Sequence, residues 1–175
     1  QFISMGNNSP TFNRVRASYA FFVPTKLINL TRGCKSSDVV NSDCPQTLGF
    51  EFKAGTIFGE LPPYEAFCMG GSSSVRGWGS CDLAVSKSFV EATAEYRVPI
   101  WRMISGALFA DVGSDLGSQD DVPGKPGKLL EKSGSGYSLG GGVGVKTPIG
   151  PLRLDAATKD LSGDWRYTLG VGWKF

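Results

Sequence analysis

Carboxylates are the side chains of this chain that could do acid–base chemistry, because the sequence contains no histidine. Glu91, Glu95, Asp111 and Asp155 lie in segments where polar and apolar residues alternate. Basic residues are interleaved with these carboxylates, whereas a general acid or base usually lines an apolar cleft that shifts its pKa. We therefore predict that the chain is not an enzyme and needs no cofactor.

The cysteines are the other reactive side chains. They lack the C-x-x-C spacing typical of zinc and redox sites, and no histidine completes a ligand set, so we predict no metal site. Cys34 and Cys44 bracket the polar segment 35–43, which favours a loop disulfide between them in an oxidising compartment; free thiols are the alternative. Cys68 and Cys81 flank another loop and can also pair, although nothing in the sequence determines their geometry.

Alternation of residue types indicates which elements carry the carboxylates. From Thr47 to Phe58, one parity reads Leu, Phe, Phe, Ala, Thr, Phe, and the other reads Gly, Glu, Lys, Gly, Ile. Successive side chains of a strand point to opposite faces. One face therefore meets a strongly apolar medium, and the other meets water or polar protein. A lipid bilayer outside and a wet lumen inside explain this pattern best.

The same alternation recurs along the chain and predicts about seven strands, each close to the length that a tilted strand needs to cross a bilayer. Tight turns at 98–103 and 147–151 alternate with long polar segments at 59–85 and 114–135, as in outer-membrane barrels. The segment 24–46 is an exception, because it is long on the side where short turns are expected. The predicted strands are Arg14 to Val23, Thr47 to Phe58, Ser86 to Val98, Ile104 to Val112, Gly136 to Lys146, Leu152 to Lys159 and Trp165 to Phe175.

Composition agrees with an all-β membrane protein. The chain has 175 residues and 24 glycines, with few helix-favouring runs. No run approaches the roughly 18 apolar residues of a transmembrane helix. A mean hydropathy of −0.09 is compatible with a barrel, because only alternate residues of a barrel strand touch lipid. The net charge of +2 forms no basic patch, which argues against a nucleic-acid partner.

About seven strands are too few for an ordinary bacterial barrel, which has an even number from eight upward. The first residues have neither a positively charged head nor a small-residue cleavage site, so no signal peptide is predicted. We expect residues 1–175 to be the C-terminal part of a larger barrel. The inward parity of the strand at 136–146 is almost all glycine, and two interpretations are open. Another segment lies against this wall, or the glycines help the barrel to bend.

Two other fold and function classes fit the strand pattern in part. A soluble ligand-binding barrel such as a lipocalin has a similar size, but its apolar residues should fill the interior and its charges should lie outside. A passive porin-like channel shares the polarity of this chain. Ion conductance without any effect on a client protein would support the passive channel.

The segment 59–85 contains the most specific motif. It reads LPPYEAF from Leu61 and GGSSSVRGW from Gly70. The last four residues resemble the Val-Arg-Gly-aromatic tetrad of the BamA and chloroplast Toc translocase superfamily, where it lies at the tip of a loop folded back into the barrel. The residues of this tetrad are Val75, Arg76, Gly77 and Trp78. Further segments resemble family motifs in the same order, namely Ala94 to Pro99, Phe109 to Gly113 and Pro148 to Arg153.

The resemblance covers nearly the whole chain and implies an antiparallel transmembrane β-barrel of about sixteen strands that follows soluble polypeptide-transport-associated (POTRA) domains. Neither those domains nor the early strands are in this chain. The resemblance also implies that Arg76 meets Glu95 and Asp111. By parity both carboxylates point inward on adjacent strands, where one planar guanidinium can bind both. The alternative is a solvated Arg76, with the carboxylates paired to lumen bases such as Lys87, Arg97 or Arg153.

The C-terminal strand carries a second family signal. Thr168, Gly170, Trp173 and Phe175 resemble the β-signal that the assembly machinery of outer-membrane proteins reads. A terminal edge strand has unpaired backbone groups and must pair with the first strand or with a partner. The alternative is that these aromatic residues form part of the interfacial girdle of a membrane protein, and both interpretations are compatible.

The resemblance implies a pore that inserts outer-membrane proteins or moves polypeptides across the membrane. Its expected partners are the lipid bilayer, client polypeptides, and the missing N-terminal part of the same protein or accessory assembly subunits. A two-partner secretion pore or a chloroplast import channel is the nearest alternative. Details of the motifs look most similar to cyanobacterial members, with chloroplast relatives next. The expected location is therefore a cyanobacterial outer membrane, or else the chloroplast outer envelope.

Overall fold

Seven long strands form one antiparallel sheet, which confirms the all-β class. The computed structural model describes residues 11–25, 27–28, 46–101, 103–148, 150–159 and 163–172. The strands follow one another in the order β1-β2-β5-β6-β7-β8-β9. All seven predicted strands are present, and their bounds are β1 Phe12–Pro24, β2 Thr47–Gly59, β5 Ser88–Trp101, β6 Ile104–Ser114, β7 Ser135–Thr147, β8 Gly150–Lys159 and β9 Trp165–Val171.

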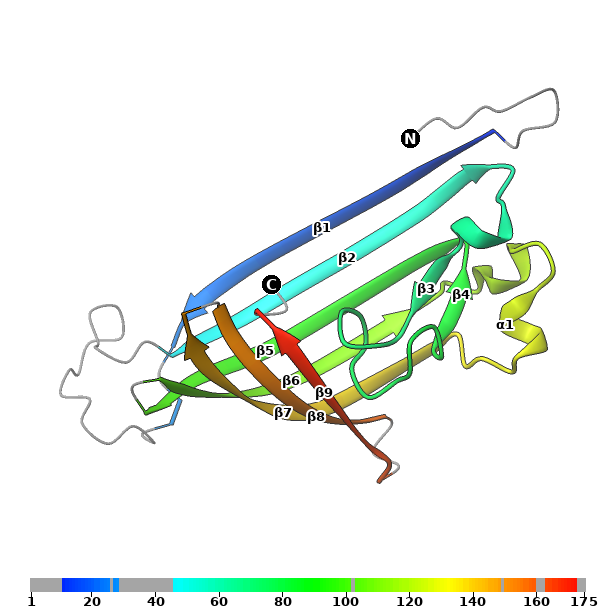
Figure 1. Ribbon diagram of the computed structural model, residues 1–175. Helices are drawn as coiled ribbons and strands as arrows, with labels where there is room; N and C mark the ends of the chain where they lie inside the picture. The colour runs from blue at the N-terminus through cyan, green and yellow to red at the C-terminus, as the bar shows by residue number, and fades with distance from the viewer. Residues whose placement is uncertain are drawn as a thin grey trace.

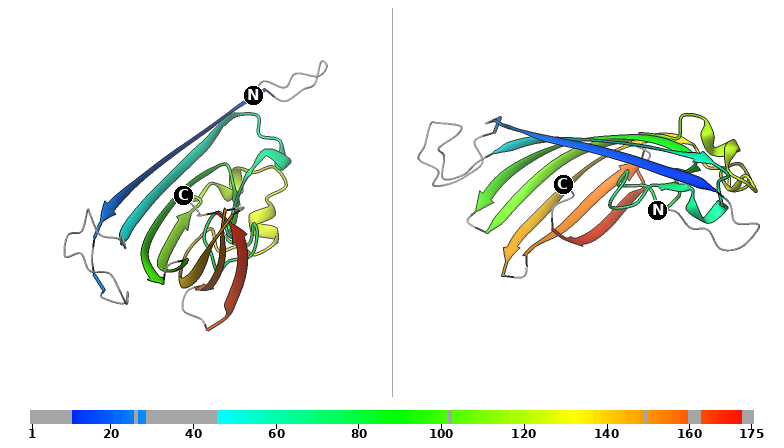
Figure 2. Two further views of the ribbon diagram at one scale, coloured as in Figure 1. Left: turned by 60° about the vertical axis from the view of Figure 1, so that its left-hand side comes forward. Right: turned by 90° about the horizontal axis from the view of Figure 1, so that it is seen from above.

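The sheet is strongly curved and forms a trough, with β1 and β9 as its edges (Figures 1 and 2). Within the described residues the trough does not close into a complete barrel. Closure would require β1 and β9 to find neighbours, because each edge leaves a row of backbone donors and acceptors unpaired. The curvature gives the sheet a concave inner face and a convex outer face.

The strand register keeps the two kinds of side chain on opposite faces. Phe52 on β2 lies opposite Tyr19 on β1 and Ala92 on β5. Its neighbour Lys53 lies opposite Ser18 and Glu91. A slip of one residue would exchange the faces of a whole strand, so the alternation of the sequence itself specifies the register.

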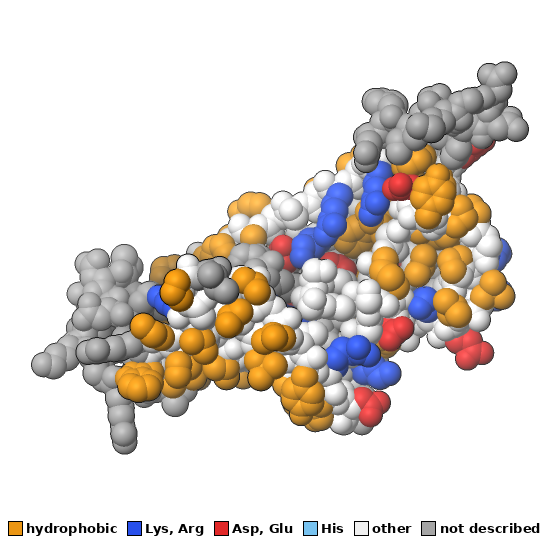
Figure 3. Space-filling view, viewed as in Figure 1, with side chains coloured by type: hydrophobic (Ala, Val, Ile, Leu, Met, Phe, Trp, Pro, Cys, Tyr) orange, Lys and Arg blue, Asp and Glu red, His pale blue; other side chains and the backbone are white. Residues whose placement is uncertain are grey.

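The outer face is apolar and exposed, whereas the inner face carries the charged side chains. Phe52, Leu108 and Tyr167 are exposed on the outer face, while Glu95 and Asp111 are buried on the inner face. Figure 3 shows hydrophobic side chains over β8 and β9, and Lys and Arg side chains in the hollow beside the segment between β3 and β4. This is the polarity of a membrane barrel and the reverse of the polarity of a lipocalin.

Some residues of outward parity are covered by protein. Tyr96 has the parity of the outer face but is buried. Its hydroxyl accepts a hydrogen bond of 3.3 Å from the backbone N–H of Leu27 and donates one to the side-chain carbonyl of Gln46. The ends of the segment between β1 and β2 therefore fold over the outer face at this point. This explains why alternation alone does not predict the burial of Tyr96.

The long connections contain short elements that lie on the concave side and at one end of the sheet (Figure 1). The segment 59–85 holds the hairpin of β3 (Phe67–Met69) and β4 (Ala84–Ser86) after the 3₁₀ turn η1 (Pro63–Glu65). The segment between β6 and β7 holds η2 (Ser118–Asp121) and the single-turn helix α1 (Pro126–Leu129). None of the helices in the described part of the chain is long and apolar enough to cross a membrane.

Candidate functional site

A small hydrophobic core fastens the β3–β4 hairpin to the inner face of the sheet. Phe67 and Met69 of β3 are buried, and the ring of Phe67 contacts that of Phe89 on β5, with centroids 4.6 Å apart. Val122, from the segment between β6 and β7, belongs to the same cluster. The hairpin therefore has a rigid base, and the tip between its strands extends along the sheet (Figure 2). We call residues 70–80 the lumen tip.

Arg76 lies at the centre of the lumen tip and is 1% exposed. Its Nε and Nη2 donate hydrogen bonds of 2.8 and 2.9 Å to the two carboxylate oxygens of Asp111 on β6. Its Nη1 donates a 2.7 Å hydrogen bond to Glu95 on β5, and its backbone N–H donates one of 3.0 Å to Asp111. The structure thus brings together the three residues of the arginine motif. A paired contact of this kind requires a planar guanidinium.

Two further residues complete the environment of the guanidinium. The ring of Phe109 lies 3.3 Å from the Cζ of Arg76, so the cation lies on its π face. Asp155 on β8 approaches Nη1 at 3.8 Å as a weaker ion pair. Burial alone would lower the pKa of Arg76, but the hydrogen bonds and charges of Asp111 and Glu95 outweigh it and raise the pKa. The guanidinium is therefore charged wherever the protein is folded.

Arginines of the sheet balance the remaining carboxylate charge. Arg97 donates a 2.7 Å hydrogen bond to the second oxygen of Glu95, and Arg153 forms a 2.8 Å ion pair with Asp155. Glu95 therefore binds both Arg76 and the lumen base Arg97, whereas Arg76 itself is buried and not solvated. Buried charges are costly unless paired, and these arginines provide the carboxylates with partners in addition to Arg76.

Trp78 holds the lumen tip against the glycine-rich wall of β7. Its indole N–H donates a 3.2 Å hydrogen bond to the backbone carbonyl of Tyr137. A Cβ on Gly136 would lie only 2.6 Å from the Trp78 ring, and one on Gly140 would lie 2.5 Å from the ring of Phe109. At Gly136 the glycine makes room for the lumen tip, as the first of the two interpretations expects, whereas at Gly140 the contacts come from the neighbouring strands β6 and β8, including the backbone carbonyl of Ala156.

The other tetrad residues shape the backbone of the lumen tip. Gly77 has a φ of +92°, and a Cβ there would lie 3.0 Å from the backbone of Thr158 on β8. Only glycine permits both the left-handed conformation and this close approach. Val75 is buried beside Gly113 of β6. A Cβ on Gly113 would lie 2.9 Å from the Val75 side chain. Each tetrad position therefore has a separate steric or polar reason for its residue type.

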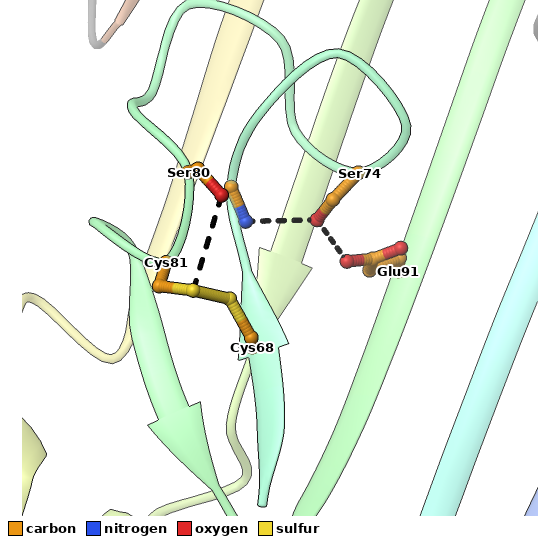
Figure 4. The surroundings of a disulfide bond; sticks show 6 residues. Cys68, Ser74, Ser80, Cys81 and Glu91 are labelled. Atoms are coloured by element: carbon orange, nitrogen blue, oxygen red, sulfur yellow. Dashed lines mark hydrogen bonds between the residues drawn. A yellow bond between two sulfur atoms is a disulfide. The ribbon is translucent and has the colours of Figure 1, made fainter. Parts of the chain in front are cut away.

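A second attachment was not predicted from the sequence. The hydroxyl of Ser74 donates to the carboxylate of Glu91 on β5 and accepts a 2.9 Å hydrogen bond from the backbone N–H of Gly70 (Figure 4). Lys53 of β2 donates a 3.2 Å hydrogen bond to the backbone carbonyl of Ser73. The inward parity of Glu91 and Lys53 was visible in the sequence, but no local pattern indicated that a loop serine would reach them.

The remaining predicted residues belong to β9 and to the two cysteine pairs, and some of them lie outside the described residues. On β9, Thr168 pairs with Asp155 and Gly170 pairs with Arg153 in the β8–β9 ladder. Trp173 and Phe175 of the terminal signal lie outside the described residues, as do Cys34 and Cys44 of the predicted disulfide. Cys68 and Cys81 form a disulfide, with their Cα atoms 4.7 Å apart. No cluster of metal-ligating side chains occurs in the ranges that the structure describes.

Sequence comparison agrees with this site. A model of the Omp85 superfamily domain matches residues 1–175. Protein TOC75-4, chloroplastic, of Arabidopsis thaliana is 38% identical over 177 residues, which cover 100% of this chain and 41% of that protein. Outer envelope protein 80, chloroplastic, of Arabidopsis thaliana is 39% identical over 128 residues, 73% of this chain and 17% of that protein. The chain thus spans less than half the length of these relatives.

The fold also resembles a solved structure. The crystal structure of BamA from Haemophilus ducreyi lacking POTRA domains 1–3 superposes with a TM-score of 0.62, covering 90% of this chain and 33% of BamA. The sequence identity of 14% supports similarity of fold alone. Similarity to cyanobacterial members stays a prediction, because these relatives are plant proteins and the structure is from Haemophilus. The family model and the relatives together establish that this chain belongs to the Omp85 superfamily.

Proposed function

We propose that this chain is part of an outer-membrane pore that inserts membrane proteins or moves polypeptides across the membrane. The single observation that carries the proposal is the buried Arg76, which holds a loop against the inner wall of a sheet with an apolar outer face. Family membership and the chloroplast relatives support an outer membrane as the location.

In this proposal residues 1–175 form the C-terminal part of the barrel, with residues 59–85 as the lumen loop. The early strands and the N-terminal POTRA domains belong to the rest of the protein. The partners are the lipid bilayer, client polypeptides and accessory assembly subunits. The network around Arg76 is structural, and the proposed function involves no enzymatic reaction. The unpaired edge of β9 offers backbone groups for pairing with the first strand or a client strand.

The relatives named as chloroplastic favour one second candidate within the same class, a pore of the chloroplast outer envelope. Its clients would then be polypeptides that enter the organelle. The lumen loop and the apolar outer face would serve this function equally, so the identity of the client separates the two candidates.

The full-length protein in lipid vesicles provides the test. We expect it to accelerate the insertion of an unfolded outer-membrane barrel, or the passage of an unfolded polypeptide, compared with empty vesicles. Reversing the charge at Asp111 with Asp111→Lys should remove this acceleration, because it places two cations together at a buried site. Ion conductance without acceleration of either client would refute the proposal and favour a passive channel.

A further inference from the structure

The disulfide between Cys68 and Cys81 lies at the foot of the lumen tip. Figure 4 shows it joining the two arms of the loop, below Ser74 and its contact with Glu91. The two cysteines are 13 positions apart and lie on either side of the tetrad in the sequence. The bond therefore closes a loop that contains the whole tetrad. Cys68 is exposed, although its neighbours on β3 are buried, because it points away from the wall. A reagent in the lumen can therefore approach Cys68 from the open side.

The backbone at Cys81 is held in an unfavourable conformation. Its φ is +61°, in the left-handed region that residues with a Cβ rarely adopt. Such a residue persists only where surrounding structure enforces it. Backbone hydrogen bonds also join the two arms, from Gly71 N–H to the Trp78 carbonyl and from Leu83 N–H to the Met69 carbonyl, at 3.1 and 3.2 Å. The disulfide adds a covalent link from Cys68, which precedes both hydrogen-bonded residues of the first arm, to Cys81, which lies between Trp78 and Leu83 on the second arm.

We propose that the Cys68–Cys81 disulfide is a reversible thiol–disulfide site that controls how firmly the lumen tip is held against the wall. When the bond is intact, the undocked loop has fewer conformations available, so docking is favoured. When the bond is reduced, Cys81 can leave the left-handed region and the two arms can separate. Arg76 keeps its carboxylate partners in both states, so reduction loosens the tip without abolishing the docked state.

The chemistry requires a dithiol as reductant. One thiolate of the dithiol attacks the Sγ of Cys68, the more exposed of the two cysteines, the S–S bond breaks, and Cys81 leaves as a thiolate. The hydroxyl of Ser80 lies 3.9 Å from the Cys81 sulfur, where it can donate a hydrogen bond to the departing thiolate (Figure 4). The second thiol of the dithiol then attacks the mixed disulfide and releases Cys68. Two electrons pass from the dithiol to the protein, two protons complete the protein thiols, and the dithiol becomes a disulfide.

The expected effect has an upper limit. A disulfide closing a loop of this length changes the ratio of docked to undocked tip by at most about 100-fold in the chain-entropy model. The hydrogen bonds that join the two arms retain part of this constraint after reduction. We therefore expect the lumen tip to open between about 10-fold and 100-fold more often in the reduced protein.

Hydrogen exchange of the full-length protein in lipid vesicles tests the proposal. The protein used is the double variant Cys34→Ser with Cys44→Ser, so that Cys68 and Cys81 are the remaining cysteines of residues 1–175. Dithiothreitol is the dithiol probe, and reduction is counted by maleimide labelling. Exchange is compared for peptides from the lumen tip and from β6. We expect about 10-fold or faster tip exchange after reduction, with unchanged exchange in β6.

Two variants separate the contributions. Cys68→Ser with Cys81→Ser should show fast tip exchange that dithiothreitol does not alter. Cys68→Ser with Cys81→Gly also lacks the bond but accepts a positive φ without strain, so its tip exchange should lie between those of the oxidised protein and the double serine variant. Ser80→Ala should slow the reduction of the bond and leave the exchange of the oxidised tip unchanged.

Three results would overturn the proposal. In the first, the disulfide would resist dithiothreitol in the folded protein. In the second, it would be reduced with no change in tip exchange. In the third, its reduction would accelerate exchange in β6 as well. The third result would mean that the bond stabilises the whole fold and does not act on the lumen tip alone. The inference concerns the loop on which the proposed function rests, but the readout is loop exchange and not client transport, so the two proposals can fail separately.

Discussion

Replacing Arg76 with lysine should release the lumen tip while keeping its positive charge. The wild-type side chain donates three hydrogen bonds of 2.7 to 2.9 Å to two buried carboxylates. A lysine ammonium is a compact donor that cannot reproduce the paired contact with Asp111. We count roughly two charge-assisted bonds lost, each about 1.5–3 kcal/mol, with part recovered by the retained charge. The expected loss is about 3 kcal/mol, or about 100-fold in the ratio of docked to undocked tip.

Limited trypsin digestion measures this ratio, because trypsin cleaves after both arginine and lysine. Cleavage at residue 76 requires the tip to leave the wall, and its rate follows the population of the open form when closing is fast. The fragments stay joined by the Cys68–Cys81 disulfide and are separated by reduction before mass spectrometry. Synthetic peptides covering residues 70–80, with arginine or lysine at position 76, give the intrinsic difference in the rate at which trypsin cleaves after the two residues. After this correction we expect about 100-fold faster cleavage in Arg76→Lys.

Arg97→Lys is the matched control. Arg97 binds the same carboxylate, Glu95, at 2.7 Å, but its side chain is 18% exposed and belongs to the sheet itself. Its replacement should change cleavage at residue 76 by less than about 5-fold, since partly exposed pairs contribute little. Equal cleavage rates in Arg76→Lys and the wild type, or in the two variants, would refute the reasoning that the paired contacts of Arg76 hold the tip.

Two further variants test the packing and the membrane face. Gly136→Ala should lower the free energy of unfolding by about 1–3 kcal/mol, because the new Cβ would lie 2.6 Å from the Trp78 ring. The control is Gly141→Ala on the same strand, where the nearest atoms to a new Cβ are 3.4 Å away. Guanidinium unfolding measures both free energies. Equal losses would contradict the role of the glycine wall. Phe52→Arg should destabilise the folded protein in lipid by up to about 2–4 kcal/mol, whereas Lys53→Arg on the inner face should be nearly neutral. The opposite order would show that the two faces are reversed.

The strands and their faces follow from local sequence, which is why they could be predicted. Residues such as Phe52 and Lys53 alternate with period two, and a register error would turn a whole strand over. The same parity placed Glu95 and Asp111 on the inner face of adjacent strands. Their contact with Arg76 depended on the resemblance to a family, because no periodicity relates a loop residue to the wall it meets.

Other features of the site depend on contacts between distant segments. Asp155 was visible as an inward carboxylate, but its approach to Arg76 depends on where the loop tip lies. Phe109 offered a signal that was overlooked, since an aromatic ring among inward carboxylates suggests a cation nearby. The Cys68–Cys81 bond was one open possibility, because disulfide geometry depends on two arms whose separation the sequence does not specify. The burial of Tyr96 likewise depends on a segment that folds back over the outer face.

The client insertion rate of the full-length protein in vesicles, compared between Asp111→Asn and Asp155→Asn, tests the central claim most directly. Asp111 accepts three hydrogen bonds from Arg76, whereas Asp155 only approaches it at 3.8 Å. If the held loop supports insertion, Asp111→Asn should slow it at least about 10-fold, because breaking a buried pair costs several kcal/mol. Asp155→Asn should then have a clearly smaller effect. Wild-type insertion by Asp111→Asn in a folded barrel would contradict the account.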